Sequence, residues 1–373
     1  MATFAQNHSL NSSGYDLALP VLDLQLAYGD ASAQQQWQQQ LRHAVRETGF
    51  FYVIGHGISI EQQQALLSQS KAFFALSEAE KQQVAMINSP HFRGYTARAT
   101  EITRGRPDQR EQFDIMLEQQ PDRAITQSWQ QLNGPNQWPR QLPELSSQLL
   151  QWQQQVTDLG IELLRLMLQA LQLPATALDN TLAPAPYVHT KLIRYPGSDD
   201  KQGQGVGAHK DPGYLTILLQ DEHAGLEVET DDGWVSAPPL PGSFIVNIGE
   251  LLELASNGYF RATMHRVISP EAGITRYSCA SFIAANLAST VPLLDLPAHF
   301  AQEAKGPATD PQNPLFYQVG QNVLKGRLRS HPDVAAAHYG DLAERFAAAP
   351  MPLARPEIKT VTSLTQNTTS VAA

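Results

Sequence analysis

The sequence of 373 residues has a single cysteine, Cys279, no run of Lys or Arg, and no long uninterrupted apolar stretch. One cysteine cannot form an internal disulfide and fits a reducing compartment. A bilayer crossing needs about 20 consecutive apolar residues, so no membrane span is expected. A formal net charge of −10 without basic clusters argues against nucleic acid or an anionic membrane as a partner. We therefore expect a cytoplasmic protein.

The chain also lacks the features of a secretory leader. Its first residues, "MATFAQNHSLNSSGYDLALP", have neither a basic start nor an apolar centre. A hydrophobic content of 42% is typical of a globular protein. The length exceeds one ordinary core, which favours a main domain of about 200 residues with a large elaboration. Residues 1–18 are expected to be flexible, and the Pro-, Thr-, Ser- and Ala-rich tail 351–373 to be disordered.

The N-terminal third alternates between short strands and helices. Residues 19–26 read as a strand, and the buried-type run "FFYVIGHGI" reads as another. Between them Trp37, Leu41 and Val45 follow helical spacing, and Gly49 stands where a helix ends. Two capping boxes open further helices, at Ser59 with Gln62 and at Ser77 with Glu80. Residues 88–114 are polar and contain Gly and Pro, which predicts an ordered loop followed by a strand.

A Pro-rich stretch, 120–143, predicts a linker-like loop before one long helix. The apolar residues of this helix step by three and four and form one stripe, which we expect to pack on the main domain. The stripe comprises Leu145, Leu149, Trp152, Val156, Leu159, Leu163, Leu166 and Ala170. From 187 to 288, short β-type runs alternate with Gly/Pro turns, a pattern typical of an antiparallel sandwich or barrel.

Two β-type runs carry candidate metal ligands. His209 and Asp211 stand at i and i+2, so on a strand both side chains point to one face. A third ligand has to come from elsewhere, and His265 in "ATMHRVIS" is the best candidate. Two histidines and one carboxylate on one side of a metal leave its other side open, which suits non-haem Fe(II) and dioxygen chemistry. The triplet "HKD" alone favours an ordinary surface turn, because the chain has 11 histidines and such a triplet can arise by chance.

A second pair of residues favours the metal interpretation. Arg276 and Ser278 again stand at i and i+2, and a guanidinium beside a hydroxyl is a receptor for a carboxylate. A metal triad and a carboxylate receptor on strands of one barrel predict an anionic co-substrate bound to the metal.

The whole string is His209-x-Asp211, 53 residues, His265, ten residues, Arg276-x-Ser278. It resembles the iron- and 2-oxoglutarate-dependent dioxygenases of the isopenicillin N synthase-like superfamily. The runs "PGSFIVNIGELLELASNG", "HRVISP", "LPVLDL", "GFFYVIGHGI" and "FFALSEAEK" are similar to runs of that superfamily, and the resemblance covers about residues 19–335.

The resemblance implies an α+β protein with a double-stranded β-helix, or jelly-roll, core flanked by helices. It divides the chain into an N-terminal dioxygenase region 19–120, a linker with the long helix 121–186, the core 187–300 and a C-terminal helical region 301–350. By resemblance His209, Asp211 and His265 hold Fe(II), and the iron binds 2-oxoglutarate and O₂. The far carboxylate of 2-oxoglutarate meets Arg276 and Ser278, and Tyr195 in "IRYP" helps to bind it. Many plant members carry Asn two residues before this tyrosine, where this chain has Ile193.

Candidate substrate residues are Lys191, which shares a strand face with Tyr195, and Arg98 and Glu101 in the polar segment before "REQFD". We expect Lys191 at the barrel mouth with its ammonium in water. Their mixed charges fit an amino-acid-like or otherwise polar substrate. The neighbouring Arg93 and Tyr95 are each expected to be surface groups.

Other polar residues are ambiguous. Arg327 and Arg329 either fold over the site or belong to a solvated helix face. His56 and His189 lack a second ligand beside them and are expected to be hydrogen-bonded structural residues. Asn247 and Gly249 in "NIGE" resemble a family turn near the metal and are interpreted first as architectural residues. Cys279 is expected to be a small buried apolar residue.

The leading hypothesis is an Fe(II)/2-oxoglutarate dioxygenase that oxidises a small soluble molecule by hydroxylation, desaturation or cyclisation and releases succinate and CO₂. Alternatives within the superfamily are a 2-oxoglutarate-independent oxidase like isopenicillin N synthase or aminocyclopropane-carboxylate oxidase, and an ethylene- and succinate-forming enzyme. From other classes, a non-catalytic jelly-roll binding protein has no need of three metal ligands. A zinc hydrolase leaves Arg276 and Ser278 unexplained.

Overall fold

Two antiparallel sheets face each other in the computed structural model, which describes residues 17–199, 204–308, 310 and 313–340. The larger sheet has the strand order β1-β2-β12-β9-β14-β7-β6-β3 and the smaller one β11-β10-β13-β8. Within the large sheet only the β1–β2 pair is parallel. This arrangement agrees with the α+β jelly-roll class expected from the sequence.

The strands are β1 Val21–Asp23, β2 Phe50–Ile54, β3 Gly94–Thr96, β4 Ile102–Thr103, β5 Arg106–Pro107, β6 Glu111–Met116, β7 Tyr187–Pro196, β8 Gln204–His209, β9 Leu215–Gln220, β10 Leu226–Thr230, β11 Gly233–Ser236, β12 Phe244–Ile248, β13 His265–Ile268 and β14 Thr275–Ala284. The α-helices are α1 Ala31–His43, α2 Ile60–Phe74, α3 Glu78–Gln82, α4 Leu145–Ala170, α5 Asp179–Leu182, α6 Glu250–Ala255, α7 Ala298–Ala301, α8 Val319–Ser330 and α9 Pro332–His338. No described helix combines the length and hydropathy that a membrane crossing requires.

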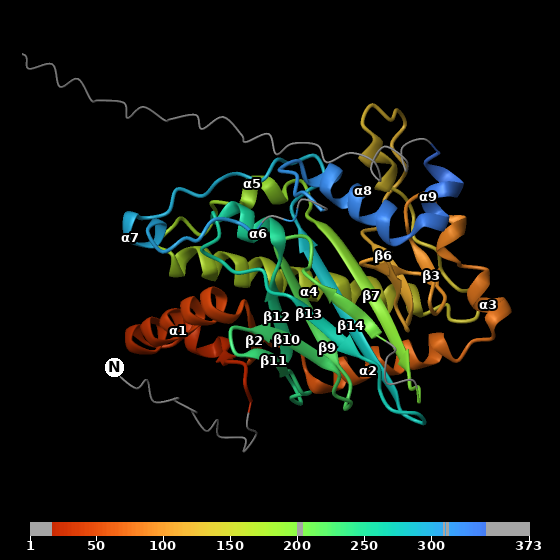
Figure 1. Cartoon of the computed structure of the whole chain (residues 1–373), viewed down its shortest axis with the longest axis horizontal. Helices are drawn as coiled ribbons and strands as arrows, with labels where there is room; N and C mark the ends of the chain where they lie inside the picture. Colours follow the sequence, from red (N-terminus) through yellow and green to blue (C-terminus); the bar gives the residue numbers. More distant parts are fainter. Residues whose placement is uncertain (1–16, 200–203, 309, 311–312, 341–373) are drawn as a thin grey trace, which may run out of the picture.

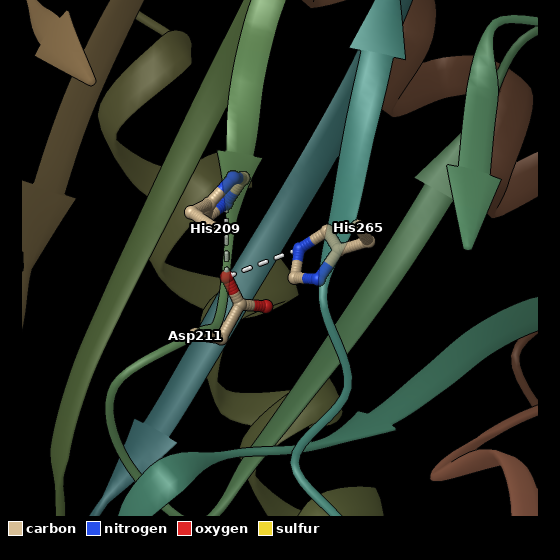
Figure 2. A group of neighbouring side chains, drawn as sticks. All are labelled: His209, Asp211 and His265. Atoms are coloured by element: carbon tan, nitrogen blue, oxygen red, sulfur yellow. Dashed lines mark ion pairs between the residues drawn. The ribbon is translucent and has the colours of Figure 1, made fainter. Parts of the chain in front are cut away.

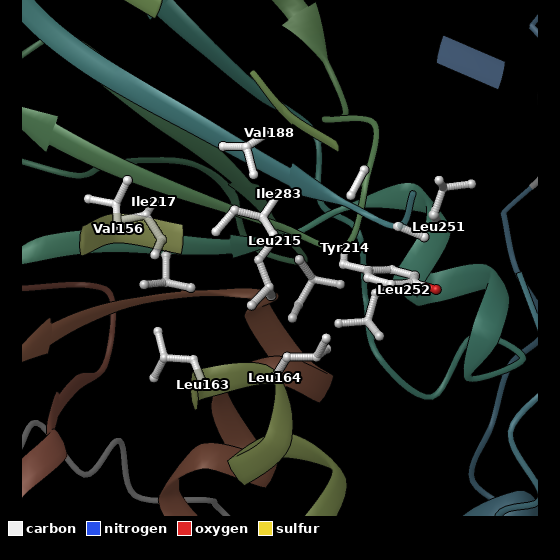
Figure 3. Close-up of a cluster of buried hydrophobic side chains, with 14 of the residues drawn as sticks. Val156, Leu163, Leu164, Val188, Tyr214, Leu215, Ile217, Leu251, Leu252 and Ile283 are labelled. Atoms are coloured by element: carbon white, nitrogen blue, oxygen red, sulfur yellow. The ribbon is translucent and has the colours of Figure 1, made fainter. Parts of the chain in front are cut away.

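Helices cover the outer face of the large sheet (Figure 1). The long helix α4 contacts β7, β9 and β14, and its predicted stripe is buried there except for Leu166, which is half-buried. On β9, Leu215 and Ile217 point to α4, where they meet Val156 and Leu163 in one apolar core (Figure 3). Alternation along each strand therefore leaves the other face of the sheet for the barrel interior.

The barrel interior has its own apolar lining between the two sheets. The large sheet contributes Phe50, Ile193, Tyr195 and Ala280, and the small sheet contributes, among others, Val206. Such a lining excludes water from any ligand bound between the sheets.

Most local predictions for the N-terminal region are confirmed. Both capping boxes are present. The helix begun by α1 continues as a π-turn to Thr48 and ends at Gly49, whose φ of +65° favours glycine. A Cβ at Gly49 would also lie 2.0 Å from the Arg261 carbonyl oxygen.

Two local predictions need correction. Residues 19–26 are not one strand, because β1 stops at Asp23, whose carboxylate accepts from the Gln25 backbone N–H and caps a 3₁₀ turn over Leu24–Tyr28. The 88–114 segment is not simply a loop before a strand, because it also contains β3 and the β4–β5 hairpin. The predicted flexibility of 1–18 concerns mainly residues outside the described ones, and the predicted disorder of 351–373 lies wholly outside them.

Candidate metal centre and co-substrate site

The three predicted metal ligands converge at one end of the small sheet. His209 is the last residue of β8 and His265 the first residue of β13, and the two are direct partners in the ladder with ring centroids 4.3 Å apart. Asp211 lies two residues beyond β8 and points its carboxylate between them (Figure 2). Asp211 does lie beside His209, as predicted. The predicted reason, a shared strand face, is wrong because β8 ends at His209.

Backbone carbonyls orient both imidazoles. The Nδ1 atom of His209 lies 2.7 Å from the Gly207 oxygen, and that of His265 lies 3.1 Å from the Thr263 oxygen. A carbonyl oxygen only accepts, so each Nδ1 carries the hydrogen. Both Nε2 atoms face the Asp211 Oδ1 atom at 3.3 Å. Two imidazole nitrogens and one carboxylate oxygen are thereby aimed at a common point.

The second carboxylate oxygen of Asp211 is held by the large sheet. Thr216 on β9 donates to Oδ2 at 2.6 Å, and the amide of Asn247 on β12 donates at 2.9 Å. Asn247 was expected to be architectural, and Thr216 was missed because "YLTILLQ" reads as an apolar strand. The sequence did contain a signal for Thr216: it is a hydroxyl residue in an apolar strand, at a position that alternation turns toward the barrel interior.

The electrostatics of this group favour a bound cation. Burial alone would raise the pKa of Asp211, but His265 and His209 hold that pKa well below its usual range. Burial likewise opposes a charge on His265, yet the Asp211 carboxylate raises the pKa of this histidine. Asp211 and His265 are buried, whereas the His209 side chain is 29% exposed, so the centre opens to solvent on the His209 side.

The ligand set fits a divalent transition metal. All the ligand atoms lie within 4.8 Å of one another, and each histidine is oriented through its other ring nitrogen, as metal-binding histidines are. Two histidines and one carboxylate match the facial triad of non-haem Fe(II) oxygenases, which keeps further positions open. The ligand atoms of a second group, Asp221 with Glu222 and His223, also lie within 4.8 Å of one another. Asp221, however, already accepts hydrogen bonds from the Tyr277 and His223 backbone N–H groups.

The predicted carboxylate receptor lies on β14, facing the barrel interior. Arg276 and Ser278 are both fully buried. Arg276 donates through Nε to the His223 oxygen at 3.2 Å and through Nη2 to Gln220 at 2.7 Å. Its Nη1 atom and the Ser278 hydroxyl have no hydrogen-bond partner in the described part of the chain. Two adjacent unsatisfied donors in an apolar surrounding fit one carboxylate of 2-oxoglutarate.

Tyr195 completes this part of the interior. Its ring lies 4.9 Å from the Arg276 guanidinium, and its hydroxyl lies beside Arg110. Ile193 is the direct partner of Ser278 in the β7–β14 ladder and belongs to the apolar lining. The position that is Asn in many plant members is thus an apolar wall here.

The candidate substrate residues are only partly brought together. Lys191 is not at the barrel mouth in water, because it is 4% exposed and donates to Glu101 at 3.0 Å. Glu101 is buried as well and also pairs with Arg110. Arg98 is exposed and donates to Gln109, away from this pair.

Several residues expected at the surface are buried. Arg93 is 1% exposed and donates to the carbonyls of Leu117 and Leu132 and to Asn136, so it ties loops together. Tyr95 is buried as well and donates to Glu111. Both are corrections to the sequence analysis, since the partners come from segments remote in the sequence.

Arg327, on α8, is buried against His189 and Asp114, whereas Arg329 is exposed and donates to Asn313. His56 contacts the Gly242 oxygen at 3.0 Å, in agreement with the structural role expected for it. Cys279 is buried, as expected, and burial raises the pKa of its thiol to about 12.

His189 bridges two charged groups while remaining neutral. Burial and then Arg327 lower its pKa to about 3. Neutral imidazole donates through one nitrogen and accepts through the other, so Nε2 donates to Asp114 and Nδ1 accepts from Arg327. Asp114 was not singled out in the sequence; the signal was one carboxylate at an inward position of the buried-type run "EQFDIM".

Comparisons with known proteins agree with this geometry. Residues 19–141 match the family model described as non-haem dioxygenase in morphine synthesis N-terminal, and residues 187–285 match that of the 2OG-Fe(II) oxygenase superfamily. The chain is 31% identical to a 2-oxoglutarate-dependent dioxygenase of Dothideomycetidae sp. (strain 11243), over 85% of this chain and 90% of that protein. It is 36% identical to a homoarginine-6-hydroxylase of Arabidopsis thaliana, over 69% of this chain and 79% of that protein.

Solved structures show the same fold. A putative 2OG-Fe(II) oxygenase family protein from Caulobacter crescentus superposes with a TM-score of 0.68 at 24% identity, covering 84% of this chain and 99% of that one. The rice dioxygenase for auxin oxidation superposes with a TM-score of 0.61 at 26% identity, covering 83% of this chain and 95% of that one.

Proposed function

The chain belongs to the 2OG-Fe(II) oxygenase superfamily, and on that premise we propose that His209, Asp211 and His265 hold its iron and that Arg276, Ser278 and Tyr195 hold its 2-oxoglutarate. The enzyme is an Fe(II)- and 2-oxoglutarate-dependent dioxygenase that oxidises a small substrate. The observation that carries the residue assignment is the pair of unsatisfied buried donors on Arg276 and Ser278, which lie on the inner face shared with Thr216, a hydrogen-bond partner of Asp211.

Bound Fe(II) supplies the oxidation, in which 2-oxoglutarate and O₂ become succinate and CO₂ as a substrate C–H bond is oxidised. The protein side chains orient the reactants. Thr216 and Asn247 keep Asp211 Oδ1 turned to the two histidines. Arg276 and Ser278 anchor the far carboxylate of the co-substrate, and the apolar lining around Ile193 and Ala280 keeps water away from it.

We propose hydroxylation as the reaction and a basic amino acid as the substrate, with homoarginine as the first compound to test. Support comes from relatives named homoarginine-6-hydroxylase, of which the Arabidopsis thaliana protein is 36% identical and the Oryza sativa protein 33% identical. The buried carboxylate of Asp114, on the interior side of β6, also favours a cationic molecule over an apolar one. The 2-oxoglutarate-independent alternatives lose support, because the curated relatives are 2-oxoglutarate-dependent dioxygenases.

The test is turnover of a substrate panel with Fe(II), 2-oxoglutarate and O₂, read as succinate release and as product mass. Homoarginine, arginine and lysine should each be compared with uncharged and acidic amino acids of similar length. The expected result is succinate formed in step with a product heavier by one oxygen atom for at least one basic amino acid. Succinate with a product lighter by two hydrogens would replace hydroxylation by desaturation, and turnover confined to acidic or apolar compounds would reject the substrate class.

The cytoplasmic location expected from the single cysteine stays a prediction, which a fractionation of expressing cells would test.

A further inference from the structure

The inner face of β6 carries two polar side chains that the iron and 2-oxoglutarate sites leave unused. Gln112 and Asp114 stand at i and i+2 on this strand, and both are 0% exposed. Their direct partners on β7 are Ile193 and Lys191. Ile193 lines the barrel interior, so Gln112 and Asp114 face the interior as well.

The strand register connects this face to the metal centre. One row across the large sheet runs from Asn247 through Thr216 and Phe282 to His189. The first two donate to the metal ligand Asp211, and His189 stacks on Phe282 with ring centroids 5.3 Å apart. Asp114 contacts His189 at the end of this row. The residues that hold Asp211 and the β6 residues therefore share the inner face of the large sheet, with Phe282 between them.

Asp114 has unused capacity as an acceptor. Its Oδ1 atom takes a hydrogen bond from the neutral His189, while the Lys191 and Arg327 nitrogens stay 3.5 and 3.6 Å away. Lys191 instead donates to Glu101. The Asp114 Oδ2 atom has no partner within the described segments, although an ionised carboxylate accepts about four hydrogen bonds.

Gln112 adds two further unpaired atoms. Both its amide oxygen and its amide nitrogen lack a partner in the described ranges. On the opposite, helix-facing side of the same sheet, by contrast, Gln153 of α4 donates to Thr190, and Thr190 shares a hydrogen bond with Ser281. Unpaired polar atoms in a protein interior are uncommon, and two neighbouring residues with such atoms point to a ligand.

We propose that Asp114 and Gln112 form the receptor for a cationic nitrogen of the substrate, a guanidinium or an ammonium group. Two neighbouring acceptor oxygens, one of them ionised, match the several N–H donors that such a group presents. This inference extends the proposed function by naming residues that bind the substrate. It rests on the proposed function, because the proposed iron site determines in which orientation the substrate binds.

The receptor also sets a length for the substrate. Neighbouring strands lie about 4.8 Å apart, so β6 places its side chains roughly 14 Å along the sheet from Thr216 on β9. A molecule with its cation on Asp114 therefore needs a chain of several carbons to bring a C–H bond to the metal. Guanidino acids with one methylene in the side chain should bind less well than those with three or four.

The test compares ligand pairs that share a carbon skeleton and differ in charge. The pairs are arginine with citrulline, homoarginine with homocitrulline, and lysine with norleucine. Each compound is titrated calorimetrically into the metal-free protein and into the protein loaded with Mn(II) and 2-oxoglutarate. The charged member of at least one pair should bind about tenfold or more tightly than its neutral partner. Asp114→Asn should remove this preference, and Gln112→Ala should reduce it, with 2-oxoglutarate affinity unchanged in both.

Asp108→Asn is the matched control, because Asp108 belongs to the same buried charge network but already accepts from Gly207, Thr103 and Gln204. It should leave the preference for the charged ligand intact. The proposal is overturned if no cationic ligand binds, if Asp114→Asn keeps the wild-type preference, or if Gln112→Ala weakens 2-oxoglutarate instead. These outcomes are independent of turnover, so a failure of basic amino acids as substrates is distinguishable from a failure of the receptor.

Discussion

The Thr216 hydroxyl donates to the Asp211 Oδ2 atom at 2.6 Å and so turns the other carboxylate oxygen to both histidines. Removal of such an outer hydrogen bond typically costs 10–100-fold in metal affinity. We expect Thr216→Val, which keeps the shape and removes the donor, to weaken Fe(II) binding by about tenfold or more. Anaerobic Fe(II) titration measures this, and Thr216→Ser is the control that should retain wild-type affinity.

His265→Ala should abolish Fe(II) binding and activity while the fold is kept. The substitution removes one of three ligands, and the two that remain cannot define a facial site. Metal content after reconstitution and the far-ultraviolet circular dichroism spectrum give the two readouts. His56→Ala is a useful comparison, since His56 is hydrogen-bonded to the Gly242 and Ile58 backbone and packs on the Phe244 ring. This substitution should leave the metal content unchanged. Full iron occupancy in His265→Ala would contradict the ligand assignment.

Arg276→Ala should raise the 2-oxoglutarate concentration needed for half-maximal activity by about 10–100-fold, because a buried carboxylate loses its charged donor. Fe(II) affinity should not change, since Arg276 contacts none of the three ligands directly. Ser278→Ala removes one neutral donor and should have a smaller effect, about three- to tenfold. The 2-oxoglutarate dependence of succinate release measures both. Equal co-substrate affinity in wild type and Arg276→Ala would show that the carboxylate binds elsewhere.

The burial of α4 allows a stability test with a built-in control. Leu163 and Leu166 lie on the same predicted stripe, but Leu163 is 0% exposed against the sheet and Leu166 is half-buried. Leu163→Ala should lower the free energy of unfolding by about 2–5 kcal/mol, as for other large-to-small core substitutions. Leu166→Ala should cost clearly less. Chemical denaturation of both variants measures the difference, and equal losses would mean that the packing of this helix is described incorrectly.

Local patterns in the sequence were sufficient for much of the fold. Period-2 runs between Gly/Pro turns predicted the strands of the region 187–288, and the family resemblance implied that His209, His265 and Arg276 belong to one site. The strand patterns depend on residues a few positions apart, and the site depends on a motif that is shared with the family. Such information is present in the order of residue types alone.

The buried charges could not be predicted in the same way. Lys191 was expected in water at the barrel mouth, Glu101 near the substrate, and Arg327 either over the site or on a solvated helix face, because a charged side chain is rarely buried without a partner. Their partners lie far away in sequence, and Lys191 and Glu101 are 90 positions apart. The sequence pattern does not say which distant carboxylate meets which cation, so the interior network became visible only once β6, β7 and α8 were placed together (Figure 1).

The neutral histidines of this network predict acid sensitivity. Burial first of all lowers the pKa of His189 to about 3 and that of His331 to about 4, against an ordinary value of 6.5. Between these values the unfolded chain binds more protons than the folded one, so stability is full above about pH 6.5 and is lost as the pH falls towards 4. We expect the melting temperature to drop between pH 7.5 and 5.

His331→Gln isolates one contribution, because glutamine keeps a polar side chain and does not titrate. Its melting temperature should fall less than that of the wild type between pH 7.5 and 5, even if its value at pH 7.5 is lower. His43→Gln, which replaces an exposed histidine at the end of α1 outside this network, should keep the wild-type slope. A slope in His331→Gln as steep as that of the wild type would mean that the pKa of His331 is nearly the same in the folded and the unfolded protein, so that its proximity to Glu101 offsets its burial.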